Sequence, residues 1–277
     1  MPDWAVGLST GCLSRMSFID ALELLRRNGF EIVEVCSLPQ HLDYHDEGAV
    51  ERAARRLQEL HMEPYSFHAP FAPDLDITSL DEDQRMGAFQ EICIAAQAAA
   101  TLGVKYFVIH PGPETGEIPR SERLERMQHG VEVLNRVVES CAELGIQLVL
   151  ENMLPHLFSG PVRDLLWLLG ALDTDEVGIC LDTGHAQLTG DLDTVVHKLS
   201  GHLWTLHASD NRGEHDDHLP PGDGILDWER LLRQLDGVWY RGAIILEIAG
   251  FEDPEEVMRA AHRGRRHIRS VARRLGP

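Results

Sequence analysis

The chain has 277 residues, of which 43% are hydrophobic and 25% charged, and its formal charge is -20 at pH 7. This composition is typical of a globular protein, and the length suits one large domain or two small ones. The surplus of acidic groups repels phosphate backbones and anionic membranes at long range, so it disfavours nucleic acid or a lipid surface as the main partner. A local basic site stays open, and solubility is the simplest role for most of the surface acid.

Five cysteines are present, and no two are spaced as CxxC. Their odd number and their positions in apolar segments predict reduced, mostly buried thiols. The first ten residues, MPDWAVGLST, lack the basic and apolar regions of a signal peptide, and no apolar run is as long as a membrane span. We therefore expect a cytoplasmic protein with no membrane partner.

Short apolar runs alternate with longer amphipathic segments along the whole chain. The apolar runs predict strands at residues 4–8, 30–36, 64–68, 105–109, 146–150, 177–181, 203–206 and 243–246. The amphipathic segments predict helices at residues 17–28, 47–60, 81–102, 121–144, 161–172, 191–199, 227–235 and 254–274. Gly103 and Gly145 are expected to end two helices, Ser121 is an expected N-cap, and Pro161 is an expected first helical residue.

Eight strand–helix units fill the chain without a long linker. Strict alternation implies parallel strands, and eight units favour a single closed (β/α)8 TIM barrel that covers residues 1–277. A doubly wound open sheet is the runner-up, but that fold places its ligand at one switch point. Candidate site residues follow six different strands here, which favours the barrel.

Six predicted strands end in, or are directly followed by, a histidine or an acidic residue. These residues are His68, His110, Glu151, Asp182, His207 and Glu247. In a barrel such side chains converge on one mouth, so that residues far apart in sequence become neighbours. A lone histidine after a strand is more often a surface or capping residue, and a lone glutamate such as Glu151 fits either role equally well, but six such strand ends together indicate a common metal site.

Three further candidates lie in the loops next to this mouth. His185 follows Asp182 by three residues in GICLDTGHAQLTG, and Asp216 and His218 come after the seventh strand. A spacing of two lets Asp216 and His218 point the same way in an extended segment, which favours Asp216 over Asp217. The Pro- and Gly-rich segment 220–224 either holds these side chains over the mouth or simply turns the chain into the next helix.

The candidate ligands are imidazoles and carboxylates, without a thiolate. This set suits Zn2+, Mn2+, Co2+ or Fe2+, and the number of histidines makes Mg2+ or Ca2+ alone less suitable. We expect one to three divalent ions, with Zn2+ or Mn2+ as the main candidates.

Several motifs resemble the xylose isomerase-like TIM-barrel superfamily, and they span essentially the whole chain. They are SFHAPF, VIHPG, LVLEN, GICLDTGHAQLTGD, LHASDN, DDHLPPGDGILDW and IILE. That superfamily includes sugar and sugar phosphate isomerases and epimerases, and the endonuclease IV family of abasic-site nucleases. Together the motifs are specific for the superfamily and only weakly specific for the activity within it.

In the isomerase and epimerase branch, the resemblance implies one divalent ion held by Glu151, Asp182, His207 and Glu247. Glu151 and Glu247 would also be the catalytic residues: one removes a proton beside a carbonyl and the other returns it, through a metal-stabilised enediolate. Our first expectation is therefore a metal-dependent enzyme of carbohydrate metabolism that isomerises or epimerises a sugar or sugar phosphate. The shortage of basic residues at the mouth slightly favours a substrate without phosphate.

In the endonuclease IV branch, the resemblance implies three zinc ions held by nine residues, each of which has a counterpart in this chain. The counterparts are His68, His110, Glu151, Asp182, His185, His207, Asp216, His218 and Glu247. Such a site would hydrolyse a phosphodiester with a zinc-bound hydroxide. Against the hydrolase, only Arg120, Arg123, Arg163 and Arg212 are expected near the mouth, whereas a nuclease needs several phosphate contacts. Nucleic acid is a disfavoured partner that stays open.

Two other functions stay open: a lyase or dehydratase that uses the same glutamates, and a barrel that binds a metal or ligand without turnover. Assembly into a homo-oligomer also stays open. His185 divides the main branches, as an extra metal ligand in the hydrolase and a substrate contact or supporting group in the isomerase. Glu34, in the second strand, is either a hydroxyl-binding residue or a solvated charge, depending on register. Trp4, Phe71 and Trp204 either wall the pocket or pack in the core.

Overall fold

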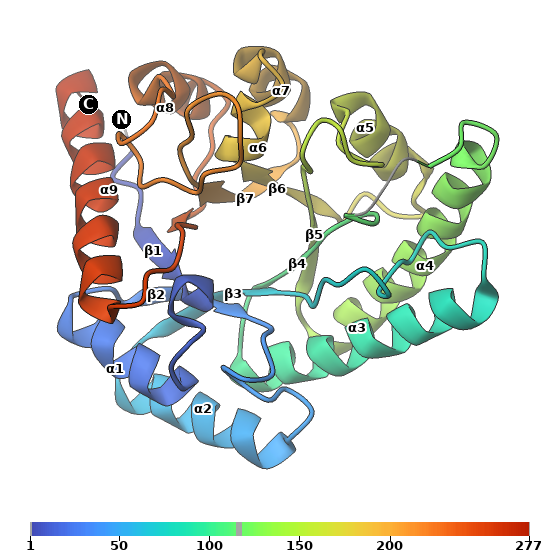
Figure 1. The fold of residues 1–277 in the computed structure, drawn as a ribbon, viewed down its shortest axis with the longest axis horizontal. Helices are drawn as coiled ribbons and strands as arrows, with labels where there is room; N and C mark the ends of the chain where they lie inside the picture. The colour runs from blue at the N-terminus through green and yellow to red at the C-terminus, as the bar shows by residue number, and fades with distance from the viewer. Residues whose placement is uncertain (1, 115–117, 277) are drawn as a thin grey trace.

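Eight parallel strands close into a barrel in the computed structural model, which describes residues 2–114 and 118–276 (Figure 1). Each strand pairs with the next along the chain, and β1 pairs with β8 to close the ring. The strands are β1 (Val6–Ser9), β2 (Ile32–Cys36), β3 (Glu63–His68), β4 (Tyr106–Ile109), β5 (Gln147–Glu151), β6 (Gly178–Asp182), β7 (Leu203–Ala208) and β8 (Ile244–Leu246). The predicted (β/α)8 barrel is therefore confirmed.

Helices form an outer layer around the ring of strands (Figure 1). They are the 3-10 helix η1 (Thr10–Leu13), α1 (Phe18–Arg27), α2 (Glu47–Glu59), α3 (Glu82–Leu102), α4 (Arg123–Leu144), α5 (Val162–Ala171), α6 (Thr183–Gln187), α7 (Leu192–Leu199), α8 (Trp228–Gly237) and α9 (Pro254–Leu275). Gly103 and Gly145 end α3 and α4 in the left-handed conformation that favours glycine, as predicted.

Most predicted elements are present, with boundaries shifted by one or two residues. Two details of the helix starts are wrong: Glu122 rather than Ser121 precedes α4, and Pro161 is the N-cap of α5 rather than its first helical residue. The short helix α6 was not expected. It begins directly after β6 because the Asp182 side chain accepts a hydrogen bond from the backbone N–H of His185, which caps the first turn.

Side-chain alternation along the strands decides what faces the inside of the barrel. In β5, Leu148 and Leu150 pack among the helices, whereas Val149 belongs to a separate inner cluster. Glu151 lies two positions after Val149, so it points inward at the C-terminal end of the strand. The same step of two leads from the inner residues Val108, Cys180 and Ile245 to His110, Asp182 and Glu247. The inner cluster thus forms the floor beneath these side chains.

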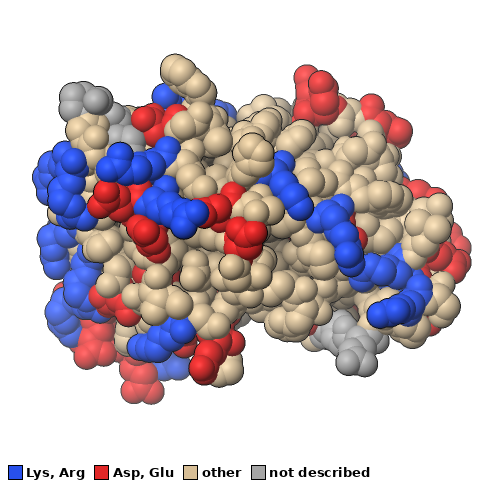
Figure 2. Space-filling view, turned by 90° about the horizontal axis from the view of Figure 1, so that it is seen from above, with Lys and Arg blue, Asp and Glu red and all other residues tan. Residues whose placement is uncertain are grey.

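The charges are mixed over the surface. Figure 2 shows one face, on which acidic and basic side chains are interspersed at the left and a run of basic side chains crosses the right. All five cysteines are free thiols, as predicted. Within residues 2–114 and 118–276, no helix combines the length and the apolar character needed to cross a bilayer.

Candidate metal centre

All nine candidate ligands meet at the C-terminal end of the barrel, where they form three groups. Within each group, one ligand atom per residue lies within 4.8 Å of the others. The first group is His68, His110 and Glu151, the central group is Glu151, Asp182, His207 and Glu247, and the third group is His185, Asp216 and His218. Glu151 belongs to two of them, so the first and central groups share one carboxylate.

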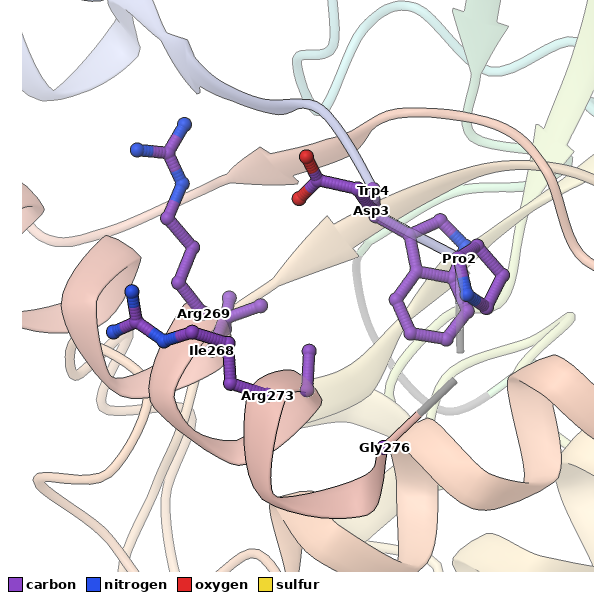
Figure 3. Close-up of a pocket in the computed structure, with 8 residues that line it drawn as sticks. Pro2, Asp3, Trp4, Ile268, Arg269, Arg273 and Gly276 are labelled. Carbon is purple, nitrogen blue, oxygen red and sulfur yellow. The ribbon is translucent and has the colours of Figure 1, made fainter.

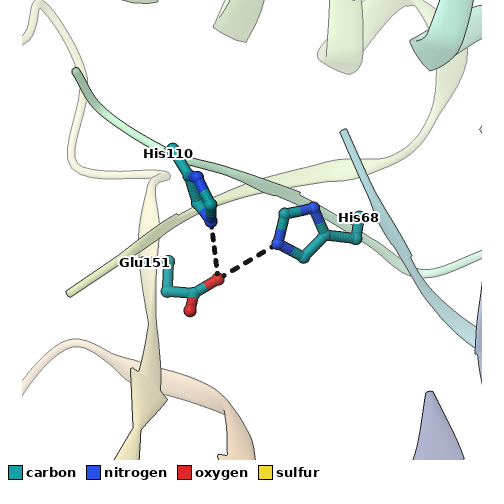
Figure 4. Close-up of side chains that lie close together, drawn as sticks. All are labelled: His68, His110 and Glu151. Carbon is teal, nitrogen blue, oxygen red and sulfur yellow. Dashed lines mark ion pairs between the residues drawn. The ribbon is translucent and has the colours of Figure 1, made fainter. Parts of the chain in front are cut away.

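The first group brings together the ends of β3, β4 and β5 (Figure 4). The Nε2 atoms of His68 and His110 lie 3.3 and 3.5 Å from the same Glu151 oxygen, Oε2. Phe71, which is 45% exposed, places its ring 5.2 and 5.1 Å from the two imidazole centroids. Phe71 therefore forms a wall beside this group.

The central group lies deepest, where β5, β6, β7 and β8 end. The Nδ1 atom of His207 is 3.0 Å from Glu247 Oε2 and 3.3 Å from Glu151 Oε2. The side chains of His207, Asp182 and Glu151 are almost completely buried, whereas that of Glu247 is 23% exposed. Glu247 is therefore the member of this group that solvent reaches most readily.

The third group joins the helix after β6 to the loop after β7. Asp216 Oδ2 lies 3.2 Å from His185 Nε2 and 3.0 Å from His218 Nε2. Asp217 instead accepts a hydrogen bond from the backbone N–H of Arg212, 2.9 Å away, so it is turned out of the group. His218 has a backbone φ of 45°, which is uncommon for a residue other than glycine and shows that the loop imposes its conformation there.

Asp210, a buried residue just after β7, holds this loop in place. Its carboxylate accepts hydrogen bonds from the backbone N–H groups of Gly222 and Leu226 and from Trp228 Nε1. A Cβ atom on Gly224 would lie 2.2 Å from the same carboxylate, so only glycine fits there. The Pro- and Gly-rich segment is thus both a rigid turn and the support for Asp216 and His218.

Each histidine has one ring nitrogen directed toward its group and the other held by a nearby oxygen. Main-chain carbonyls of Ala69, Asn152 and Glu247 accept from the Nδ1 atoms of His68, His185 and His218, respectively. Carboxylates of Glu114 and Glu34 hold His110 Nδ1 and His207 Nε2, at 2.5 and 2.7 Å. Such partners fix the ring orientation and the tautomer of a metal-binding histidine.

The electrostatics of the groups couple the imidazoles to the carboxylates. Burial alone would lower the pKa of His110 and His218, but neighbouring carboxylates raise these pKa values to about 9 and about 10. Burial would raise the pKa of Glu247, yet His207 holds it at about 2. Burial dominates at Asp182, whose pKa is raised to about 6. In the absence of a metal the protein therefore balances buried carboxylates with protonated histidines.

The imidazole and carboxylate atoms of the three groups are chemically suited to bind divalent cations. Several buried ligand atoms have no hydrogen-bond partner within the described residues: Glu151 Oε2, Asp182 Oδ2, His207 Nδ1, Asp216 Oδ1 and Glu247 Oε2. Buried polar atoms are normally satisfied, and each such orphan costs free energy unless something else meets it. Imidazole and carboxylate donors directed at shared points are the ligands that Zn2+ and Mn2+ prefer.

The arginines expected near the mouth are mostly engaged in ion pairs. Arg123 lies 2.6 Å from Asp164, and Arg212 lies 3.5 Å from Asp217. Arg163 also faces Asp164, at 3.7 Å. These guanidinium groups are therefore partly neutralised by the protein itself, which weakens their use as contacts for a phosphate backbone.

For several residues the sequence left the role open or did not predict it. Glu34 faces the inside of the barrel and is completely buried against His207. Trp4 and Trp204 line a hollow at the opposite, N-terminal end of the strands and do not wall the site. The supporting roles of Glu114, Asn152 and Asp210 were not predicted. The acidic residue four positions after His110 was the available signal for Glu114, whereas nothing local marks the role of Asn152.

A separate hollow of about 600 Å³ lies beside the end of α9 (Figure 3). Pro2, Asp3 and Trp4 face Arg269 and Arg273 across it. Because Trp4 comes just before β1, this hollow lies at the amino-terminal end of the barrel, away from the three groups. Catalytic residues of TIM barrels gather at the carboxyl ends of the strands, so the three groups define the candidate site.

The fold and the site together define a (β/α)8 barrel whose strands gather histidine and carboxylate side chains at their C-terminal ends. The chain belongs to the xylose isomerase-like TIM barrel family, whose model matches residues 22–270. This confirms the predicted superfamily.

Comparison with individual proteins gives relatives in both predicted branches. The chain is 33% identical over 195 residues to uncharacterized protein MJ1311 of Methanocaldococcus jannaschii, covering 67% of this chain and 64% of that protein. It is 24% identical over 180 residues to "Probable endonuclease 4" of Mycoplasma genitalium, covering 60% of each. The matched part is thus less than two thirds of these relatives. A crystal structure of a D-tagatose 3-epimerase-like protein superimposes with a TM-score of 0.84 at 25% identity, covering 98% of this chain and 100% of that one.

Proposed function

We propose that this protein is a divalent-metal-dependent isomerase or epimerase of a sugar or sugar phosphate, with its reaction centre at the central group. The observation that carries the proposal is the meeting of Glu151 and Glu247 with Asp182 and His207, whose ligand atoms lie within 4.8 Å of one another and which are buried apart from the partly exposed Glu247. The similarity to a D-tagatose 3-epimerase-like protein over the whole barrel supports a carbohydrate substrate.

The four residues of the central group would hold the ion, Zn2+ or Mn2+. When bound, the ion supplies Lewis acidity toward the oxygens of the substrate beside the reacting carbon. The carboxylates of Glu151, Asp182 and Glu247 would together more than neutralise a divalent cation, and His207 would contribute a neutral donor once its Nδ1 proton has left.

The two glutamates approach the pocket from different sides, because β5 and β8 are separated in the ring by β6 and β7. A proton can therefore be removed on one side and returned on another, as epimerisation requires, or returned to the neighbouring carbon. Histidine neighbours hold the pKa of Glu151 well below its usual value against the effect of burial, and that of Glu247 at about 2. Both side chains are thus ionised at neutral pH, as a base must be.

We assign the first proton transfer to Glu247. Its side chain is 23% exposed, compared with 2% for Glu151. Glu247 can exchange a captured proton with solvent, while Glu151 is enclosed by His68, His110 and His207. Substrate hydrogen lost at this carbon should therefore be partly replaced by solvent hydrogen during turnover.

A second candidate is a phosphodiesterase of the endonuclease IV type with three zinc ions. The specific observation in its favour is that the first and third groups are complete beside the central one. With both the first and central groups loaded, Glu151 would be committed to two ions, which leaves it poorly suited to proton transfer. The ion pairs of Arg123 and Arg212 and the acidic balance of the chain weigh against a DNA substrate.

One comparison of variants separates the two candidates. His218→Asn removes an imidazole from the third group only, and the Asn amide can still donate to the Glu247 carbonyl that His218 Nδ1 contacts at 3.0 Å. The isomerase proposal expects Glu151→Gln and Glu247→Gln to lower kcat by about 10²- to 10⁴-fold, the range of lost acid–base catalysis, and His218→Asn to lower it much less.

The assays are epimerisation of ketoses in deuterated water, followed by NMR, and nicking of an abasic-site duplex at physiological salt. Zinc content and anomalous scattering count the ions in the same preparations. Strand nicking that requires three ions and is lost in His218→Asn would refute the isomerase proposal in favour of the hydrolase.

A further inference from the structure

A buried carboxylate that is outside all three groups contacts a histidine of the candidate metal centre. Glu34, on β2, has no exposed surface, and its Oε2 lies 2.7 Å from His207 Nε2 on β7. The Ser66 hydroxyl donates to the same oxygen at 2.8 Å. Its other oxygen, Oε1, has no hydrogen-bond partner within the described residues. An acidic side chain in such a place is costly, so its presence calls for a partner that needs it.

The two ring nitrogens of His207 face different partners, Glu34 on one side and the central group on the other. A carboxylate accepts hydrogen bonds only, so the Nε2 atom facing Glu34 must carry a proton. The Nδ1 atom on the other side of the ring faces Glu151 Oε2 at 3.3 Å and Glu247 Oε2 at 3.0 Å. Nδ1 is therefore the nitrogen that is available as a ligand in the central group.

His207 differs from the other histidines of the centre in the group that holds its second ring nitrogen. Three of them are held by main-chain carbonyls, and His110 is held by Glu114, whose side chain is 38% exposed. A fully buried carboxylate is a stronger acceptor than a carbonyl, and its hydrogen bond is less weakened by water. The imidazole it holds is correspondingly a better electron donor to a metal at the opposite nitrogen.

We propose that Glu34 is a positioning residue: it fixes the tautomer and the orientation of His207 so that the central group is preorganised for a divalent ion. This inference rests on the proposed metal site at the central group. Ser66 supports Glu34 in turn, since its hydroxyl fixes the Oε2 atom that His207 contacts.

The test uses Glu34→Gln, which keeps the shape of the side chain and replaces a charged acceptor with a neutral one. Zinc affinity at the central group, measured by chelator competition, should fall about 10- to 100-fold, as is usual for partners that hold a metal-binding histidine. Ser66→Ala should have a smaller effect in the same direction. The matched control is Thr205→Val, which removes a buried hydroxyl from the same strand as His207 and should leave zinc affinity unchanged.

A spectroscopic readout separates positioning from a merely structural role. In proton–nitrogen NMR spectra, with His207→Gln to assign the signal, wild-type protein loaded with zinc should show a strongly hydrogen-bonded Nε2–H on His207. Glu34→Gln should weaken that hydrogen bond, whereas Thr205→Val should not. A structural role alone would lower thermal stability without moving this signal.

Two results would overturn the inference: coordination of zinc by His207 Nε2 in the wild type, or unchanged zinc affinity in Glu34→Gln. The first requires no variant, so it decides the matter even if Glu34→Gln does not fold. Failure of the proposed function would look different. If the metal site itself were wrong, the wild type would bind no zinc at the central group, while the Nε2–H signal of the metal-free protein would still report the contact with Glu34. If only the isomerase activity were wrong, zinc would still bind at the central group and the effect of Glu34→Gln on its affinity would stand.

Discussion

Replacement of Glu151 by glutamine should weaken metal binding at the central group, and at the first group where that group also binds metal, without affecting the third group. Glu151 Oε2 faces His68, His110 and His207 at 3.3 to 3.5 Å, and no other carboxylate belongs to both the first and central groups. Asp216 serves the third group alone. Zinc titration of Glu151→Gln should therefore show weaker binding at the central group, and at the first group where the wild type binds zinc there, with any binding at the third group unchanged.

The magnitude follows from ligand linkage. At a zinc concentration of 100 times Kd, a site stabilises the folded protein by about 2.7 kcal/mol. If the variant binds about 100-fold more weakly, the same zinc concentration equals its Kd and contributes only about 0.4 kcal/mol. The loss of about 2.3 kcal/mol per site corresponds to a reduction of about 5 to 9 °C in the zinc-dependent shift of Tm for a chain of this size.

The assay is differential scanning calorimetry of wild type and variant, each with zinc and with a chelator. Comparing the shift within each protein cancels any effect of the substitution on the metal-free fold. His218→Asn is the control, because it should reduce only the contribution of the third group. A zinc-dependent shift in Glu151→Gln as large as that of the wild type would refute the shared-ligand reasoning.

Four further predictions concern the charges of the centre, the loop beside it and the packing of the barrel. The free energy of unfolding of the metal-free protein, measured with urea in the presence of a chelator, should fall from about pH 6.5 to pH 10. The pKa values of His110 and His218 are raised to about 9 and about 10, so their stabilising contribution is lost as the pH rises through these values. A free energy of unfolding that stays constant across this range would contradict those shifts. Zinc affinity should rise over the same range, and calorimetry in buffers of different ionisation enthalpy should detect released protons. Asp210→Ala should lower the free energy of unfolding by about 1 to 3 kcal/mol or more through unsatisfied N–H groups, and weaken zinc binding at the third group, whereas Asp217→Ala should not weaken it. Gly178→Ala should cost about 1 to 3 kcal/mol in thermal or urea unfolding, because a Cβ there would lie 2.1 Å from the Trp204 ring.

Local sequence signals were sufficient for the elements and for the set of candidate ligands. The strand ends could be read because apolar runs stop at residues such as His110 and Glu247, and helix ends because Gly103 and Gly145 adopt the left-handed conformation that other residues avoid. Alternation of strand and helix was enough to predict a closed parallel barrel.

Other features could not be read locally, because they depend on contacts between distant strands. Glu34 and His207 are 173 residues apart, and only closure of the ring with its register brings them to 2.7 Å. Asn152, whose main-chain carbonyl accepts from His185 Nδ1, carries no distinguishing sequence signal. The short helix α6 also escaped prediction, since it forms through the Asp182 cap at the end of a buried strand.

The sequence by itself determined the residue types of the centre and the strand end or loop that carries each of them. The tertiary structure decided how they are divided into three groups, and it placed Asp216, which the spacing favoured over Asp217, beside His185 and His218. The physical reason is that side-chain alternation fixes a face only relative to its own strand. Barrel closure and the loop held by Asp210 then set the faces relative to one another.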